Sequence, residues 1–283
     1  MALSFNSQRK DGTLIVDALN LAFRWKHQGR TDFRYEYEKT VKSLADSYKC
    51  EDIIITADGG SSSYRKAILP DYKQNRKDKY ATQTEEEKIA FEEFFEEYQA
   101  TLDILSDKMT LLRFDGVEAD DIAAHLVKEK EQYGFGRIWL ISSDRDWDLL
   151  IQDKVSRFST VTRKEITLDN WEDHYDVEPD KYLTLKCLAG DTGDNVPGIA
   201  GIGPKRAVSL IEQYGDLFDI YNACPIDSKY KFIQTLNENA DRLLLNAELM
   251  DLESYSEQAI IEADMNIEDL FSQILEYLNE VRD

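Results

Sequence analysis

Residues 13–20, "TLIVDALN", join a short apolar run rich in β-branched residues to an aspartate, where the pattern changes. Runs of this kind are typical of strands buried in a parallel sheet. The stretches "DIIITADGG" at 52–60 and "RIWLISSDRDWD" at 137–148 repeat the form. Three such runs predict an open sheet, and ligands of open sheets bind beyond the carboxyl ends of the strands.

The segments between these runs have apolar residues at helical spacing. Residues 33–48 and 118–133 both follow this pattern, so we expect an α/β fold with a central, mostly parallel sheet flanked by helices. A long amphipathic helix is predicted over about 84–108, with Phe91 and Phe94 on its apolar face and glutamates elsewhere.

The remainder of the chain changes character after about residue 178. Residues 155–168 are typical of a β-hairpin, and the later pattern is helical to the end, interrupted by a glycine-rich stretch. We therefore expect a core at 1–178 and a helical C-terminal region at 179–283.

The composition is that of a folded protein with a large excess of acids. The 283 residues include 56 Asp and Glu against 34 Lys and Arg, a formal net charge of −22, and 42% are hydrophobic. No apolar run has the length of a membrane span, and the first residues lack the apolar core of a signal peptide, so we expect a cytoplasmic protein. Positive charge, which phosphate binding requires, is gathered in a few places.

Acidic residues occur where the predicted strands end and helices begin. The set comprises Asp17, Asp58, Asp144 and Asp146 after strands, Glu118, Asp120 and Asp121 at a helix start, and Asp191 and Asp194 in the glycine-rich stretch. Carboxylates gathered at one sheet edge repel one another unless a cation neutralises them. Oxygen ligands without cysteine or histidine favour Mg²⁺ or Mn²⁺, and paired ions about 4 Å apart are typical of phosphodiester hydrolysis. The alternative is that each acid caps a helix or turn or is merely solvated.

Two basic segments accompany the acids. The stretch "GIAGIGPKRAVSLI" at 198–211 predicts a glycine hairpin and a helix from Pro204, whose amides, with Gly201, Gly203, Lys205 and Arg206, suit a DNA phosphate. The alternative is a helix-turn-helix core with glycines kept for close packing. Residues 65–79 carry six Lys or Arg against two Asp, which suits an electropositive passage or a solvated loop.

These motifs together resemble the flap endonucleases, or 5′ nucleases, found free in bacteriophages and fused to bacterial DNA polymerase I. The resemblance runs from about Asp17 to the helix after Ala207. Its most specific element is "GDTGDNVPGIAGIGPKRA" at 190–207, supported by three shorter motifs: "YKQNR" at 72–76, "GVEADD" at 116–121 and "SSDRDWD" at 142–148.

The resemblance implies a PIN-like nuclease core, a helical arch over about 64–107 and a C-terminal helix-hairpin-helix region. It also implies a structure-specific 5′ nuclease of DNA replication or repair, in which all nine acids bind two or more Mg²⁺ or Mn²⁺ ions. Lys73 and Arg76 match residues that meet the scissile phosphate, Tyr72 matches a stacking partner, and Arg24 and Lys26 match substrate contacts. The backbone at 199–203 is a candidate site for K⁺.

The expected partner is DNA with 5′ flaps or free 5′ ends, RNA primers are a second candidate substrate, and a monomer is expected. Two other functions stay open at this stage. One is a DNA-binding module of the same shape that has lost cleavage. The other is an α/β phosphatase, which usually needs an acid two residues after the strand-end nucleophile, whereas Ala18 and Leu19 follow Asp17.

Overall fold

The computed structural model describes residues 11–282 and contains the predicted central sheet. Its strand order is β3-β2-β1-β4-β5-β6, in which β1 to β5 are parallel and β6 is antiparallel to β5. The strands are β1 (Gly12–Asp17), β2 (Cys50–Thr56), β3 (Thr110–Leu112), β4 (Arg137–Ile141), β5 (Val155–Phe158) and β6 (Glu165–Ile166). The three predicted strands are confirmed, whereas the three residues of β3 were too short a run to be recognised.

The central strand β1 is buried on both faces, which explains its continuous apolar sequence. Leu14, Ile15 and Val16 are fully buried, and β1 pairs with β2 on one side and β4 on the other. The register sets Asp17 beside Thr56 at the carboxyl ends of β1 and β2. The strand-end acids are thereby brought to one edge of the sheet.

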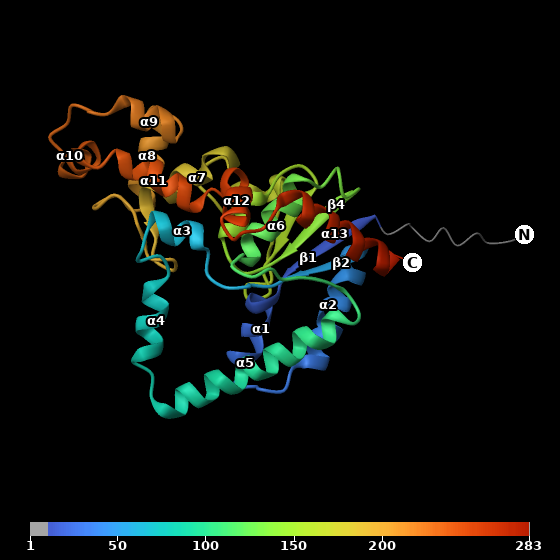
Figure 1. Ribbon diagram of the computed structural model, residues 1–283. Coiled ribbons are helices and arrows are strands. Elements are labelled where there is room, and N and C mark those ends of the chain that lie inside the picture. Colours follow the sequence, from blue (N-terminus) through green and yellow to red (C-terminus); the bar gives the residue numbers. More distant parts are fainter. Residues whose placement is uncertain (1–10, 283) are drawn as a thin grey trace, which may run out of the picture.

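Helices cover both faces of this sheet (Figure 1). Those before residue 182 are α1 (Ala18–Lys26), α2 (Arg34–Tyr48), α3 (Ser63–Ile68), α4 (Gln74–Ala81), α5 (Glu85–Ser106) and α6 (Ala119–Lys128), with 3₁₀ turns at Asp146–Leu150, Leu168–Asp173 and Pro179–Lys181. One core joins α1, α2 and α5 to one face of the sheet, and another joins α6 to the opposite face.

The arch expected over about 64–107 consists mainly of α4 and α5, which extend from the sheet as an arm (Figure 1). The helix α5 begins with a capping box between Thr84 and Glu87. Farther along, Phe94, Leu102 and Leu105 are buried against the sheet side of the molecule. The predicted apolar face of the long helix is thus confirmed at its C-terminal half, which anchors the arm.

The C-terminal region begins with α7 (Tyr182–Ala189), a two-stranded ladder of β7 (Gly190–Asp191) and β8 (Val196–Pro197), and α8 (Pro204–Tyr214). It continues with α9 (Leu217–Ala223), α10 (Lys231–Glu238), α11 (Asp241–Met250), α12 (Leu252–Ile261) and α13 (Ile267–Arg282).

This region does not pack as one unit. Leu252 and Ile260 of α12 and Leu270 of α13 share a hydrophobic core with α6 of the sheet domain, whereas α7 to α11 form a separate core. The physical reason is that α12 buries its apolar side chains on α6, while α13 packs against α12 and the edge strand β3. None of the described helices combines the length and apolarity needed to cross a membrane.

Candidate active site

Asp17 and Asp58 follow neighbouring strands; Asp17 caps α1, and Asp58 binds the first amide of α6. The Asp17 Oδ1 accepts a hydrogen bond from the Asn20 amide at 3.0 Å, and its Oδ2 accepts one from the Ser142 hydroxyl at 2.8 Å. The Asp58 Oδ1 accepts from the Ala119 amide at the start of α6, at 2.8 Å. Capping and a functional role are therefore compatible, because capping fixes where each carboxylate points.

Asp144 and Asp146 lie in the turn that follows β4. Asp146 begins a 3₁₀ helix, and its amide donates to the Asp144 Oδ1 at 3.0 Å. Across the edge, the Asp120 Oδ1 accepts from the indole of Trp147 at 2.6 Å. The turn therefore orients these two carboxylates.

Burial, and to a smaller extent the neighbouring carboxylates, raise the pKa values of three acids at this edge. Burial first, and then the nearby Asp58 carboxylate, raise the pKa of Asp17 to about 7. Burial is also the main cause that raises the pKa of Asp146 to about 6 and that of Asp120 well above its usual range; Asp144 adds to both shifts. Clustered carboxylates with raised pKa values are typical of functional sites.

Two lysines lie among the acids. The Lys73 Nζ is 2.9 Å from the Glu118 Oε1, and the Lys186 Nζ is 2.5 Å from Asp146 and 3.0 Å from Asp191. Burial alone would raise the pKa of Asp191, but the Lys186 ammonium lowers it. Sequence reasoning missed Lys186; its position in the last turn of α7, five residues before Asp191, was the available signal.

Asp121 differs from the other predicted ligands. It is fully buried, and its two oxygens accept hydrogen bonds from the Arg65 guanidinium at 2.8 and 2.6 Å. Arg65, also missed in the sequence, is buried as well and donates to the Leu249 carbonyl at 3.0 Å. This pair ties α3 to α6 and α11, so the structure favours a structural role for Asp121 over metal binding.

Tyr72 does not stand in a position to stack on a DNA base. Its side chain is 4% exposed, and its hydroxyl, with one hydrogen to donate, lies between Glu118 at 3.1 Å and Asp194 at 2.9 Å. The next residue, Lys73, has a left-handed backbone (φ 57°), and Arg76 is 2.5 Å from Asp194. The predicted stacking role is corrected to a role in orienting two acids, since the ring is packed into the protein.

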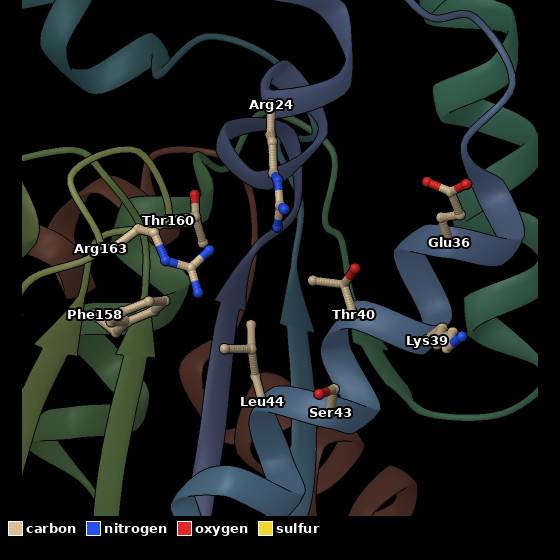
Figure 2. Close-up of a pocket in the computed structure, with 9 residues that line it drawn as sticks. All are labelled: Arg24, Glu36, Lys39, Thr40, Ser43, Leu44, Phe158, Thr160 and Arg163. Carbon is tan, nitrogen blue, oxygen red and sulfur yellow. The ribbon is translucent and has the colours of Figure 1, made fainter. Parts of the chain in front are cut away.

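Arg24 and Lys26, predicted together as substrate contacts, lie on opposite sides of α1. The Lys26 ammonium is 3.9 Å from the ring centre of Phe91 on the arch helix α5. Arg24 faces a pocket between α1, α2 and the turn after β5 (Figure 2). Two positions along a helix differ by about 200°, which explains the opposite directions.

The glycine hairpin is confirmed, with α8 beginning at Pro204 as predicted. Gly201 has φ +85°, which glycine adopts without strain, and its carbonyl accepts a hydrogen bond from Arg206. Gly203 caps α8 with open space around its Cα. The Lys205 ammonium has no ion pair among residues 11–282, so it is free to meet a phosphate, whereas Arg206 is held against the hairpin.

The donor set fits a hard divalent cation. Within the described part of the chain, no three acidic, histidine or cysteine side chains stand close enough together to hold a metal ion, and lysines pair with two of the acids. However, the ligands on offer are carboxylate oxygens, and neighbouring carboxylates add to the burial that raises the pKa of Asp17 and of Asp120. A divalent cation relieves this repulsion between carboxylates.

Comparisons with known proteins agree with this geometry. The family model described as "5'-3' exonuclease, N-terminal resolvase-like domain" matches residues 12–176, and the model of its C-terminal SAM fold matches 177–272. The flap endonuclease of Escherichia phage T5 is 41% identical over 262 residues, covering 92% of this chain and 90% of the relative.

Solved structures of the T5 enzyme superpose closely. A complex described as pseudo-enzyme-product with DNA and metal ions has a TM-score of 0.88 and 39% identity, covering 95% of this chain and 98% of that one. A structure with bound zinc ions has a TM-score of 0.89 and covers 96% of this chain. The chain belongs to the 5′-3′ exonuclease family and is a metal-dependent 5′ nuclease of the flap endonuclease type.

Proposed function

We propose that this protein hydrolyses DNA phosphodiesters next to the junction between a 5′ single strand and a duplex. The observation that carries the proposal is the cluster of buried carboxylates, with raised pKa values, at the sheet edge beside the base of an arch. Burying like charges together destabilises the folded protein, so a cluster of buried carboxylates indicates a functional site. The nearby cations Lys73 and Arg76 suit the phosphate of the strand being cut.

Eight of the nine predicted acids remain candidate ligands for two or more Mg²⁺ or Mn²⁺ ions. They are Asp17, Asp58, Glu118, Asp120, Asp144, Asp146, Asp191 and Asp194. When bound, such ions help to form hydroxide from water and stabilise charge on the phosphate and the leaving oxygen.

The protein's own groups prepare this site in three ways. Asn20 and Ser142 hold the Asp17 carboxylate by hydrogen bonds. The Tyr72 hydroxyl lies between Glu118 and Asp194 and donates its one hydrogen to this pair. Lys73, 13% exposed, is positioned to exchange its Glu118 partner for a substrate phosphate, which would place positive charge where negative charge develops.

The C-terminal hairpin is proposed to hold the duplex by its backbone. Lys205 and the open backbone at Gly203 support this, because backbone amides and ammonium groups meet phosphates without reading bases. A potassium ion on the carbonyls at 199–203 would require Arg206 to leave the Gly201 carbonyl. We further propose a cytoplasmic monomer with RNA primers as a second substrate. Its two parts divide near residue 178, except that α12 and α13 pack back on the first part.

The test is a time course of cleavage on a duplex carrying a labelled 5′ flap, in Mg²⁺ and in Ca²⁺, with a small aryl phosphate in parallel. We expect a fragment cut near the flap base in Mg²⁺ alone. Tight DNA binding without release of a cleaved fragment in either ion would indicate a DNA-binding module that has lost cleavage. Hydrolysis of the aryl phosphate without DNA cleavage would indicate a phosphatase.

A further inference from the structure

A buried ion pair joins the turn that carries Asp144 and Asp146 to the neighbouring strand β5. Its members are Arg157 of β5 and Asp148 of the 3₁₀ turn, and both side chains are buried. The Arg157 Nε donates to the Asp148 Oδ1 at 2.5 Å, and the Arg157 Nη2 donates to the Oδ2 at 2.7 Å. Two parallel hydrogen bonds of this kind fix the orientation of both side chains.

The same guanidinium also holds the other end of this turn. Its third nitrogen, Nη1, donates to the Ser142 carbonyl at 2.8 Å. Ser142 is the first residue after β4, and Asp144 and Asp146 lie between Ser142 and Asp148. One side chain therefore restrains both ends of the segment 142–148, on which two of the candidate ligands stand.

Ser142 extends this restraint to a third acid. Its hydroxyl donates to the Asp17 Oδ2 at 2.8 Å and accepts a hydrogen bond from the Asp144 amide at 3.1 Å. Because the carbonyl and the hydroxyl belong to one residue, a shift of the Ser142 carbonyl would also disturb its contacts with Asp17 and Asp144. The ion pair is thus connected by hydrogen bonds to acids that follow two neighbouring strands.

The Asp148 carboxylate has one more donor, the Tyr175 hydroxyl, which binds its Oδ2. The Tyr175 ring packs against Trp171 and against Tyr182, with the ring centres 4.5 Å apart in each case. These aromatic contacts hold the hydroxyl in place. The ion pair is therefore anchored in packed protein on the side away from the turn.

Stability alone does not explain a pair of this kind. The free energy needed to remove two charges from water is about as large as their attraction inside the protein, so apolar side chains of similar volume often stabilise a fold equally well. What the pair supplies is direction, because a planar guanidinium meets its acceptors in a fixed arrangement. Contacts that orient metal ligands are worth about 10- to 100-fold in metal affinity or activity.

Resting on the proposed function, we propose that Arg157 is a positioning residue, which fixes the segment 142–148 so that Asp144 and Asp146 bind a divalent cation. It acts through the Ser142 carbonyl and the Asp148 carboxylate, which accept hydrogen bonds from all three guanidinium nitrogens. Asp148 is then the partner of Arg157 and not a further metal ligand, because the guanidinium and Tyr175 occupy its oxygens.

The first measurement is a calorimetric titration of the DNA-free protein with Mn²⁺. The test variant combines Arg157→Met with Asp148→Asn, which removes both charges, leaves no buried charge unpaired and keeps an acceptor for Tyr175. We expect the Mn²⁺ affinity to fall about tenfold or more. Denaturant titration in EDTA establishes that the variant is folded. Arg157→Lys carries the same test if the double variant is unfolded, because an ammonium keeps the charge but lacks the planar fork.

The second measurement is single-turnover cleavage of the labelled 5′ flap at increasing Mg²⁺ concentration. The double variant should need about tenfold more Mg²⁺ for its half-maximal rate. Its rate at saturating Mg²⁺ should fall by a smaller factor, because Asp144 and Asp146 are still present. Its affinity for the flap DNA in EDTA should equal that of the unmodified protein, since Arg157 is buried and acts on the turn.

The matched control combines Arg34→Met with Glu97→Gln. The Arg34 guanidinium also binds a carboxylate through two nitrogens, with its Nε 3.0 Å from the Glu97 Oε2, but this pair joins α2 to α5. The control should keep the Mn²⁺ affinity of the unmodified protein.

Three results would overturn the proposal. They are an unchanged Mn²⁺ affinity in the folded Arg157 variant, an equal loss of Mn²⁺ affinity in the control, and a loss of flap affinity in EDTA, which would assign Arg157 to DNA binding. A protein that shows the expected Mn²⁺ affinities but does not cleave the flap would refute the proposed function and leave the positioning role of Arg157 supported.

Discussion

The carboxyl edge of the sheet and the glycine hairpin both carry charge, but they carry it differently. At the sheet edge the acids are buried, hydrogen-bonded and close enough to shift one another's pKa. At the hairpin, Lys205 is exposed and has no ion pair among the residues described. Removing one of several buried, interacting charges changes the pKa values of the others, whereas each exposed charge contributes to binding independently. We therefore expect chemistry at the first region and additive binding at the second.

The largest expected effect is on cleavage, from neutralising one acid of the sheet edge. Asp144→Asn or Asp191→Asn should reduce single-turnover cleavage in Mg²⁺ by about 10³-fold or more, because a lost ligand mainly harms the transition state. DNA affinity in Ca²⁺ should stay within about tenfold. Unchanged cleavage in both variants would show that these acids are not ligands and would remove the contrast between the two regions.

A smaller effect is expected for Lys73→Ala, because Lys73 is a partly exposed lysine that pairs with a buried acid of the sheet edge. Although burial alone would lower the pKa of Lys73, Glu118 and Asp194 raise it, so the ammonium stays charged. Its loss should slow cleavage by about 10- to 100-fold and weaken binding much less, since it acts where charge develops. Equal losses in rate and affinity would make Lys73 a docking residue like those of the hairpin.

At the hairpin the expected effect is a few-fold loss of affinity. Lys205→Ala should weaken binding by a similar factor on unrelated DNA sequences and lower the slope of log affinity against log salt by about 0.9. Titrations of two duplexes of different sequence at several salt concentrations provide the measurement. A loss confined to one sequence would contradict contact with the backbone.

The smallest effect concerns stability and pH. Since the pKa of Asp17 is raised to about 7 in the folded protein, its contribution to stability is present below about pH 4 and is lost as the pH rises through 7. In EDTA, Asp17→Asn should therefore raise the free energy of unfolding at pH 8 by about 1 kcal/mol, because asparagine keeps the helix cap. Denaturant titrations at pH 4 and pH 8 measure the free energy of unfolding of both proteins. A variant that is equally stable or less stable than the unmodified protein at pH 8 would show that the ionised Asp17 carboxylate does not destabilise the fold.

The fold and most of the candidate site were predictable because their signals are local. The apolar runs predicted β1, β2 and β4, and Pro204 after the glycines predicted the start of α8. Errors arose where partners are distant in sequence. Tyr72 was predicted to stack on DNA because a tyrosine in a basic segment gives no sign of its burial. Asp121 was predicted to be a metal ligand because no residue near it in the sequence indicates that its carboxylate pairs with the Arg65 guanidinium.

The sequence by itself determined the strands, the positions of acids at strand ends and helix starts, and the glycine hairpin, because each depends on residues that are neighbours along the chain. Only the tertiary structure decided which charges are neutralised: Lys186 lies between Asp146 and Asp191, and Arg65 is paired with Asp121. The reason is physical, since the energy of a charge depends on its burial and on its nearest neighbours in space, and folding sets both.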